Sequence, residues 1–178
     1  MSTEEKRDKK LDELYDLIDG IEVAMLTTRR PDGRLVSRPM ATLERARGAD
    51  LWFATNIETH KIDELETDPH VNVAYYDPRS SEWVSVSGTA RVSRNRKTVR
   101  QLYDPNWKAW LGKVDDDRDG GPDDPRIALI EIDADSVIYL KKDRAAPALL
   151  YEVAKGFVTA GPPATGEVRR VSRAELDR

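Results

Sequence analysis

The sequence predicts a mainly β fold of the α+β class, in which short antiparallel strands form a barrel with flanking helices. Strand-like segments separated by tight turns recur through residue 140, and 83–93 alternate apolar and polar side chains. Closing such strands into a barrel removes exposed sheet edges. The 178 residues suffice for one core, and the absence of cysteine excludes disulfides, thiolate metal sites and a cysteine nucleophile.

The first predicted element is an amphipathic helix at the N-terminus. Acidic residues follow Ser2 and Thr3, and apolar side chains then recur at helical spacing. They are Leu11, Leu14, Tyr15 and Ile18. Gly20 supplies a stop for this helix.

Strands and one short helix are predicted between residues 23 and 93. We expect strands at 23–28, 34–43, 51–55, 71–76 and 83–93. The turn Pro31-Asp32-Gly33 joins the first two as a hairpin. A helix over 61–67 ends at Asp68-Pro69.

The rest of the chain predicts further helices, two closing strands and a tail. Asn95 caps a helix through about Tyr103, and Trp107, Trp110 and Leu111 continue at helical spacing. We expect an acidic loop at 113–125, strands at 127–132 and 136–140, a helix at 148–159 and a polar tail at 161–178. The expected organisation is a barrel domain, 1–160, followed by the tail, 161–178.

The acidic loop imitates the start of a calcium-binding loop. Asp115, Asp117, Asp119 and Gly120 have the spacing of its first ligands, but the twelfth position, which needs a bidentate carboxylate, is Arg126. An acidic surface loop is therefore the better interpretation. The two histidines lie on separate predicted elements, so no metal site is expected.

Charge and hydropathy disfavour several classes of partner. The chain has 29 Lys plus Arg against 33 Asp plus Glu, a net charge of −4, which predicts no binding to nucleic acid or anionic lipid. No stretch approaches the roughly 20 apolar residues of a membrane span, and residues 1–20 lack a secretion signal. We expect a cytoplasmic protein.

Two segments have the chemistry of a flavin nucleotide site, which needs donors for a phosphate and an apolar slot for the ring. In the first, Arg38 can reach a phosphate, while Pro39 interrupts the strand ladder and leaves backbone groups free. In the second, Thr59 and Lys61 add a hydroxyl and an ammonium to a helix N-terminus.

These segments resemble a known family. Ser37-Arg38-Pro39-Met40, Phe53-x-Thr55-x-x-x-Thr59-x-Lys61 and Ser87-Gly88-Thr89-Ala90 resemble the FMN-binding split barrels related to pyridoxamine 5'-phosphate oxidase. Thr159–Pro163 followed by Gly166-Glu167 resembles their general stress protein branch. The resemblance implies a six-stranded antiparallel split β-barrel with Greek-key topology, and FMN as cofactor.

The resemblance also implies roles for individual residues. Arg38 and Lys61, helped by Thr59 and His60, would hold the phosphate. Backbone near Pro39 and Met40, together with Thr55 and Asn56, would meet the flavin ring and ribityl chain. The family site lies at a homodimer interface, so Trp83, Trp107 or Trp110 would close it from the second subunit. From their helical spacing alone, Trp107 and Trp110 are more typical of a core.

The predicted function is that of an FMN-binding oxidoreductase of the general stress protein type, with an unidentified small-molecule redox substrate and no assigned catalytic residue. Two alternatives stay open: a non-catalytic flavin carrier or sensor dimer, and a deazaflavin-dependent reductase on the same fold. Pyridoxamine phosphate oxidases carry a Trp and an Arg in a C-terminal substrate segment, and this chain has no Trp after Trp110. We therefore expect no useful oxidation of pyridoxamine 5'-phosphate.

Overall fold

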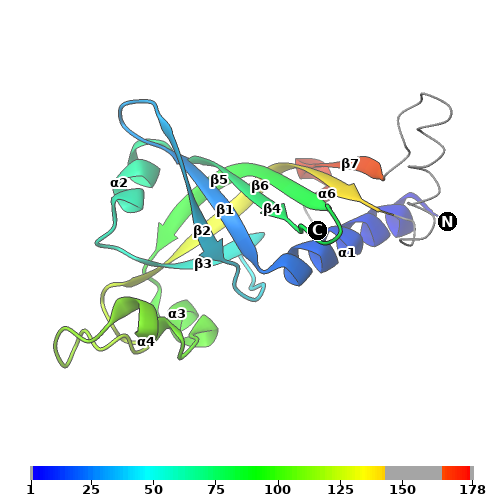
Figure 1. Cartoon of the computed structure of the whole chain (residues 1–178). Helices are drawn as coiled ribbons and strands as arrows, with labels where there is room; N and C mark the ends of the chain where they lie inside the picture. Colours follow the sequence, from blue (N-terminus) through cyan, green and yellow to red (C-terminus); the bar gives the residue numbers. More distant parts are fainter. Residues whose placement is uncertain (1, 143–165, 177–178) are drawn as a thin grey trace.

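The computed structural model describes residues 2–142 and 166–176, which form one antiparallel sheet of seven strands with helices around it (Figure 1). The strands are β1 (Val23–Arg29), β2 (Leu35–Ala41), β3 (Leu51–Asn56), β4 (His70–Tyr76), β5 (Trp83–Ser93), β6 (Ile127–Lys141) and β7 (Glu167–Ser172). The helices are α1 (Thr3–Ile21), α2 (His60–Thr67), α3 (Arg96–Leu102), α4 (Trp107–Leu111) and α6 (Arg173–Leu176). The predicted fold class is confirmed.

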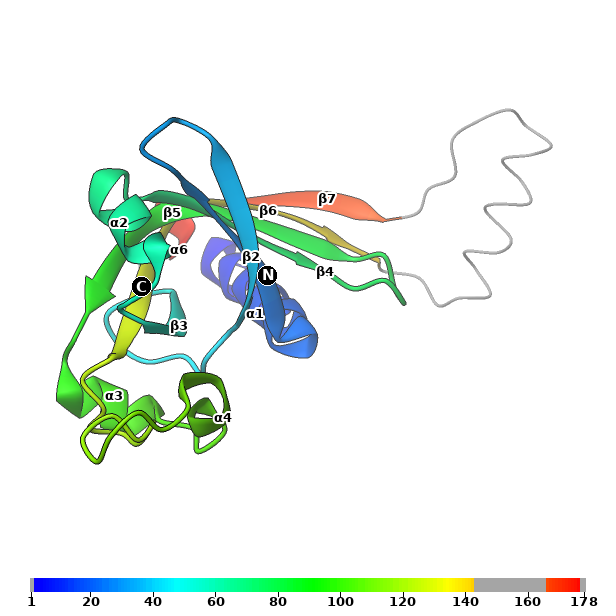
Figure 2. The ribbon, with the colours of Figure 1, turned by 60° about the vertical axis from the view of Figure 1, so that its left-hand side comes forward.

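The sheet curls without closing. Its order is β2-β1-β4-β5-β6-β3, and β7 pairs with β6 outside this path. The two edges of the path, β2 and β3, meet at an isolated bridge between Thr42 and Phe53, next to which Leu43 N–H donates to the Trp52 carbonyl at 2.9 Å. The barrel is therefore split between these edges. Figures 1 and 2 show α2 apart from α3 and α4, which lie next to each other.

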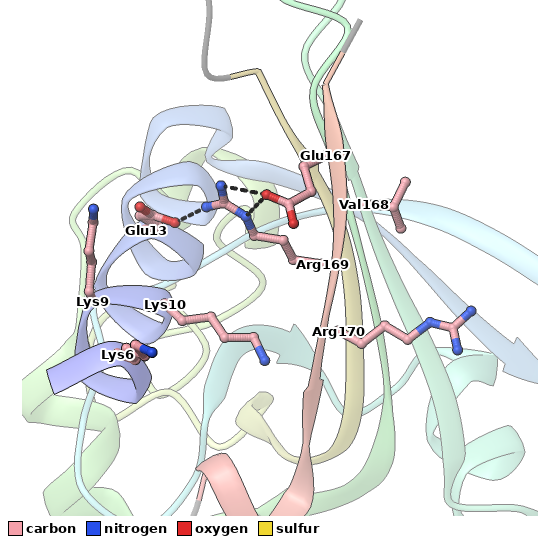
Figure 3. Close-up of a pocket in the computed structure, with 8 residues that line it drawn as sticks. All are labelled: Lys6, Lys9, Lys10, Glu13, Glu167, Val168, Arg169 and Arg170. Atoms are coloured by element: carbon pink, nitrogen blue, oxygen red, sulfur yellow. Dashed lines mark hydrogen bonds and ion pairs between the residues drawn. The ribbon is translucent and has the colours of Figure 1, made fainter. Parts of the chain in front are cut away.

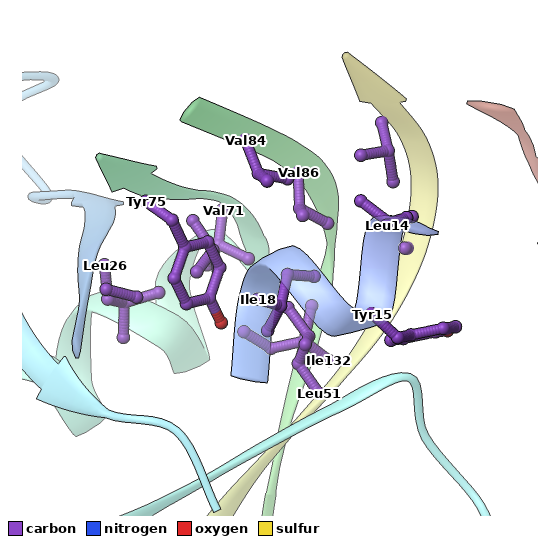
Figure 4. Packing of buried hydrophobic residues seen from close by; sticks show 14 of the residues in the cluster. Leu14, Tyr15, Ile18, Leu26, Leu51, Val71, Tyr75, Val84, Val86 and Ile132 are labelled. Carbon is purple, nitrogen blue, oxygen red and sulfur yellow. The ribbon is translucent and has the colours of Figure 1, made fainter. Parts of the chain in front are cut away.

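The core lies between the sheet and α1. A capping box between Ser2 and Glu5 starts this helix. The helix ends at Ile21, one residue beyond Gly20, and the next residue, Glu22, has a φ of 61°. The buried α1 residues Leu11, Leu14, Tyr15, Leu17 and Ile18 pack against inward side chains of the strands (Figure 4). The amphipathic pattern predicted for α1 is confirmed.

A second, smaller core lies under α3 and α4. It contains Trp52, Val99, Ile127 and Leu129, with Trp107 packed against it. Asn95 caps α3 through hydrogen bonds from the Lys97 and Thr98 backbone N–H groups. This cluster fixes α3 and α4 at the β3 end of the sheet.

The longest strand corrects one prediction. Residues 127–132 and 136–140 were expected as separate strands, but β6 runs through both, and β5 follows it with a shift in register between Ser87 and Gly88. A Cβ at Gly88 would lie 2.3 Å from the Asp133 carbonyl oxygen. The bulge thus absorbs the irregularity within a continuous ladder, and only glycine fits there.

The described part of the predicted polar tail is ordered secondary structure. Its strand β7 pairs with β6, and Lys10 binds Glu175 at 2.7 Å while Arg169 binds Glu13. These ion pairs connect α1 to the C-terminal elements. The helix expected at 148–159 lies outside the described residues, so the domain boundary at residue 160 stays a prediction.

The acidic loop at 113–125 is organised around the side chain of Arg126. The buried Arg126 guanidinium donates to the carbonyls of Leu111 (2.9 Å), Gly112 (2.8 Å) and Arg118 (3.1 Å), and to the carboxylate of the buried Asp124 (2.7 Å). Among the described residues, no cluster of acidic or histidine side chains could hold a metal ion. In the same residues, no helix has both the length and the apolarity needed to cross a bilayer.

Candidate functional site

Six side chains from four elements meet at the β2 side of the split barrel, and we call them the cationic cluster. They are Thr28 on β1, Arg38 on β2, Thr55 on β3, Thr59 at the start of α2, and Lys61 and Glu64 on α2. Four of the six, Arg38, Thr55, Thr59 and Lys61, are site residues that the sequence predicts. The helix α2 spans the two edges of the sheet and brings their side chains together.

Lys61 joins β3 to the start of α2. Its ammonium donates to the Thr55 hydroxyl at 3.0 Å and to the Thr59 hydroxyl at 2.9 Å. The Thr59 hydroxyl donates in turn to the Asn56 carbonyl at 2.7 Å and does not cap the helix. Thr59 thus stands at the N-cap position of α2 without a side-chain cap bond. In the first turn, the Ile62 N–H donates to the Thr59 carbonyl at 3.0 Å, whereas the His60 and Lys61 N–H groups have no acceptor among the described residues and are available to an anion.

Arg38 is held by two acceptors from different elements. One terminal nitrogen, Nη1, donates to the Thr28 hydroxyl at 2.7 Å, and the other, Nη2, donates to Glu64 Oε2 at 2.6 Å. Thr28 also donates to the same Glu64 oxygen at 2.5 Å. Because Thr28 and Glu64 are buried, this network fixes Arg38 against the protein interior.

The electrostatics of the cluster favour an anion. Burial lowers the pKa of Lys61, the nearby positive charge of Arg38 lowers it further, and the Glu64 carboxylate offsets part of this effect. For Glu64, burial alone would raise the pKa, but hydrogen bonds from Thr28 and Arg38 hold it below its ordinary value. Two cations thus repel each other at a helix N-terminus that already favours negative charge.

The edge strand β2 presents backbone groups to the same region. At the two ends of the β1–β2 ladder, the Arg30 N–H donates to the Arg34 carbonyl and the Thr42 N–H donates to the Glu22 carbonyl. In this register the even-numbered residues of β2 form the hydrogen-bonded pairs with β1, so the backbone groups of the odd-numbered residues point away from β1. The backbone of Pro39 therefore faces the open edge, where its missing N–H removes no ladder bond. This arrangement fits the predicted slot of free backbone groups.

The remaining residues of the predicted cofactor site are placed as follows. Met40 points inward and packs against the main core. The Asn56 side chain accepts from the Glu58 N–H at 2.8 Å and shapes the turn between β3 and α2. His60 is the exposed first residue of α2. Each of these three residues is one or two positions in sequence from a member of the cationic cluster.

The tryptophans are not brought to the cluster within one chain. Trp107 packs edge to face on Tyr103, with ring centroids 5.4 Å apart, whereas Trp110 is 91% exposed. The core interpretation is thus wrong for Trp110. The helix α4 that carries both lies apart from α2 in two views (Figures 1 and 2). Trp83 is half-buried at the start of β5.

Sequence reasoning missed Thr28 and Glu64. The Lys61–Glu64 spacing of three residues puts both side chains on one helix face. In the hairpin register, Arg38 pairs with Leu26, so Thr28 is its diagonal neighbour on the same face. Both signals are readable only once Arg38 is known to face α2.

A separate groove lies on another part of the molecule. It measures about 690 Å³ between α1 and β7 and is lined by Lys6, Lys9, Lys10, Glu13, Glu167, Val168, Arg169 and Arg170 (Figure 3). Arg169 is paired with Glu13 and Glu167, and Lys10 is paired with Glu175. The groove mixes cations with the carboxylates of Glu13 and Glu167, and none of the site residues predicted from the sequence line it. We therefore place the functional site at the cationic cluster, where four of those predicted residues meet.

The chain is similar to several known proteins. The family model described as pyridoxamine 5'-phosphate oxidase like matches residues 9–163. Protein bli-3 of Neurospora crassa is 35% identical, with 99% of this chain and 86% of bli-3 covered. A solved structure described as a general stress protein 26 from Jannaschia sp. CCS1 has a TM-score of 0.70 at 23% identity, covering 93% of this chain and 99% of its own.

A further similar structure carries the name of a flavin-binding protein. The general stress FMN/FAD binding protein from Xanthomonas citri has a TM-score of 0.60 at 25% identity, and the match covers 75% of this chain and 89% of the other. The resemblance that the motifs at Arg38, Thr59 and Gly88 indicate is confirmed.

Proposed function

The chain belongs to the pyridoxamine 5'-phosphate oxidase-like family, and from this premise we propose that it binds FMN, with the cationic cluster holding the phosphate. FMN would supply a redox centre that accepts one or two electrons. The role of this chain is to bind and orient it. We assign no catalytic residue.

The observation that carries the proposal is the repulsion between Arg38 and Lys61. Both are partly buried beside the start of α2, and Arg38 lowers the pKa of Lys61. A phosphate placed between two cations and a helix N-terminus would relieve this repulsion. The hydroxyls of Thr55 and Thr59 add neutral donors, and the open β2 edge at Pro39 offers backbone groups for a ring.

The first test removes the ammonium. Lys61→Ala should weaken FMN binding by roughly ten- to hundredfold, the loss expected for a charge-assisted contact. Riboflavin, which lacks the phosphate, should bind both proteins alike in fluorescence quenching titrations. Lys97→Ala, which alters an exposed lysine on α3, is the matched control. Unchanged FMN affinity in both Lys61→Ala and Arg38→Ala would contradict the phosphate clamp.

The same group predicts a pH dependence. The phosphate would raise the pKa of Lys61 in the complex above its lowered value in the free protein. Binding free energy from this group is therefore fully present below the pKa of Lys61 in the free protein, and it is lost as pH rises through the higher pKa of Lys61 in the complex. We expect FMN affinity to fall at alkaline pH in the wild type, and this loss to be absent in Lys61→Ala.

We also propose that two copies form a homodimer through the outer face of the sheet. One row of outward side chains crosses six strands without a charge: Ala41, Val23, Tyr76, Trp83, Leu140 and Val168. Val23, Tyr76 and Val168 are each more than half exposed. A second copy would cover this apolar row by a two-fold contact.

Sedimentation tests the dimer. The wild type should sediment at about twice the chain mass, and Val23→Glu should shift it toward the monomer. Among the tryptophans expected to close the site from the partner, Trp110 is the exposed one, so Trp110→Ala should weaken FMN binding without changing the dimer. A monomer that binds FMN at full stoichiometry would contradict a shared site.

Turnover separates the remaining alternatives. Oxidoreductase function predicts flavin reduction by NADH or NADPH in stopped-flow experiments, whereas no reduction favours a carrier or sensor acting in the cytoplasm. If the purified protein showed the absorption of a deazaflavin, a deazaflavin would take the place of FMN as the proposed cofactor. An aerobic assay with pyridoxamine 5'-phosphate should give no turnover near the ~1–10³ per second typical of enzymes.

A further inference from the structure

We propose that Thr28 and Glu64 act as a positioning cradle that fixes the Arg38 guanidinium so that its remaining N–H groups point toward the phosphate. The cradle is defined by two oxygens, Thr28 Oγ1 and Glu64 Oε2. The inference rests on the proposed function, because it names the residues that prepare the same site for its ligand.

The two oxygens bind the end of the guanidinium together. They lie 2.5 Å apart in a hydrogen bond of their own, and each accepts from a different terminal nitrogen of Arg38, at 2.7 and 2.6 Å. Arginine has five N–H donors in a rigid plane. Two donors are therefore spent on the cradle, and the Nε–H with one N–H on each terminal nitrogen is left for a ligand.

The cradle supports Arg38 from two independent elements. Thr28 is 1% exposed on β1, and Glu64 is 7% exposed on α2. Arg38 itself lies on the edge strand β2, where a long side chain would otherwise sample many rotamers. Anchoring its far end to two buried acceptors removes this freedom before the ligand arrives.

The Glu64 carboxylate also limits the charge of the site. Arg38, Lys61 and Glu64 sum to one positive charge, beside the partial charge of the α2 N-terminus. Glu64 offsets part of the repulsion between Arg38 and Lys61, and the remaining positive charge is left for an anionic ligand. The cradle thus holds Arg38 in place while the site keeps a net positive charge.

A double-mutant cycle tests the cradle through FMN affinity. Glu64→Gln and Thr28→Val should each weaken FMN binding by roughly tenfold, because Arg38 loses a fixed acceptor. In an Arg38→Ala background the same changes should have less than about a twofold effect, because coupled residues are not additive. Riboflavin affinity should be unaffected. Glu66→Gln, on the exposed face of α2, is the control.

A second measurement does not depend on the flavin. In the free wild type, the Arg38 Nε–H resonance should be sharp, with slow rotation of the guanidinium, and it should broaden in Glu64→Gln. Unchanged or tighter FMN binding in Glu64→Gln and Thr28→Val, or equal losses in the Arg38→Ala background, would overturn the cradle. Failure of the wild type to bind FMN would instead overturn the proposed function.

Discussion

Two arginine–carboxylate pairs in this molecule use the same chemistry for opposite purposes. Arg126, with a side chain 4% exposed, donates to Asp124 and to three backbone carbonyls. Arg38, with a side chain 20% exposed, donates to Thr28 and Glu64, and its other N–H groups have no partner among the described residues.

A structural arginine differs from a binding one in how many of its donors are left unused. The donors of Arg126 are consumed by the loop that surrounds it, so its removal must damage that loop. The donors of Arg38 are partly kept in reserve beside a second cation, Lys61. Counting unused donors on a fixed guanidinium therefore separates the two roles.

The largest expected effect is on stability at Arg126. Arg126→Ala should lower the free energy of unfolding by about 3–5 kcal/mol, because it leaves the buried Asp124 carboxylate without its partner. Denaturant titration measures this loss. Arg100→Ala, which breaks the exposed pair with Asp123, should cost less than ~1 kcal/mol. Equal losses of unfolding free energy in the two variants would contradict a structural role for Arg126.

Arg38→Ala should give the opposite signature. We expect a smaller loss of stability, about 1.5–3 kcal/mol, because water can reach the partly exposed site and solvate Glu64. FMN affinity should fall at least tenfold, while the folded Arg126→Ala protein keeps near wild-type affinity. If Arg38→Ala destabilises the fold as much as Arg126→Ala and leaves FMN binding intact, Arg38 is structural.

Lowering the pH should remove the stability that the ion pair between Arg126 and Asp124 contributes. The hydrogen bond from Arg126 and those from backbone N–H groups hold the pKa of Asp124 at about 2, below the ordinary value of an aspartate. The unfolded state therefore binds more protons in this window, so stability is lost as pH falls from about 4 toward 2. Asp124→Asn should flatten this part of the stability profile. The exposed Asp123→Asn should leave its slope unchanged.

The smallest effect is expected where the acidic loop approaches the cationic cluster. Arg118 Nη1 lies 3.8 Å from Oε1 of Glu58, the residue before Thr59 in the chain. Both side chains are well exposed. Arg118→Ala should change the free energy of unfolding by less than about 1 kcal/mol, and salt should reduce this further. A larger loss, or weaker FMN binding, would show that the loop supports the site.

Much of the fold follows from local patterns. The inward alternation of β5 and the helical spacing of α1 both have one buried face, so periodicity predicts them well. The sequence predicts two closing strands, 127–132 and 136–140, with a break at residues 133–135. The structure continues there because Arg91 pairs with Asp133 and Gly88 admits the bulge, contacts that local patterns do not encode.

The site was predictable where single residues carry the signal. Arg38 and Lys61 are cations beside a proline-interrupted strand and a helix start, and these features are local. Glu64 gains its role only from the contact between β2 and α2, which are distant in sequence. Trp110 has the spacing of a core residue, but α4 has only five residues, too few to bury more than one tryptophan face.

The ion pairs between α1 and the last elements join opposite ends of the chain. Lys10 and Glu175 are separated by 165 residues, and Arg169 and Glu13 by 156. Contacts this distant close the largest loops in the chain, so they form late in a folding reaction. During synthesis, the edge of β6 that β7 covers must stay open until residues 167–172 emerge. We expect this edge to be the surface at which an incomplete chain associates with its neighbours.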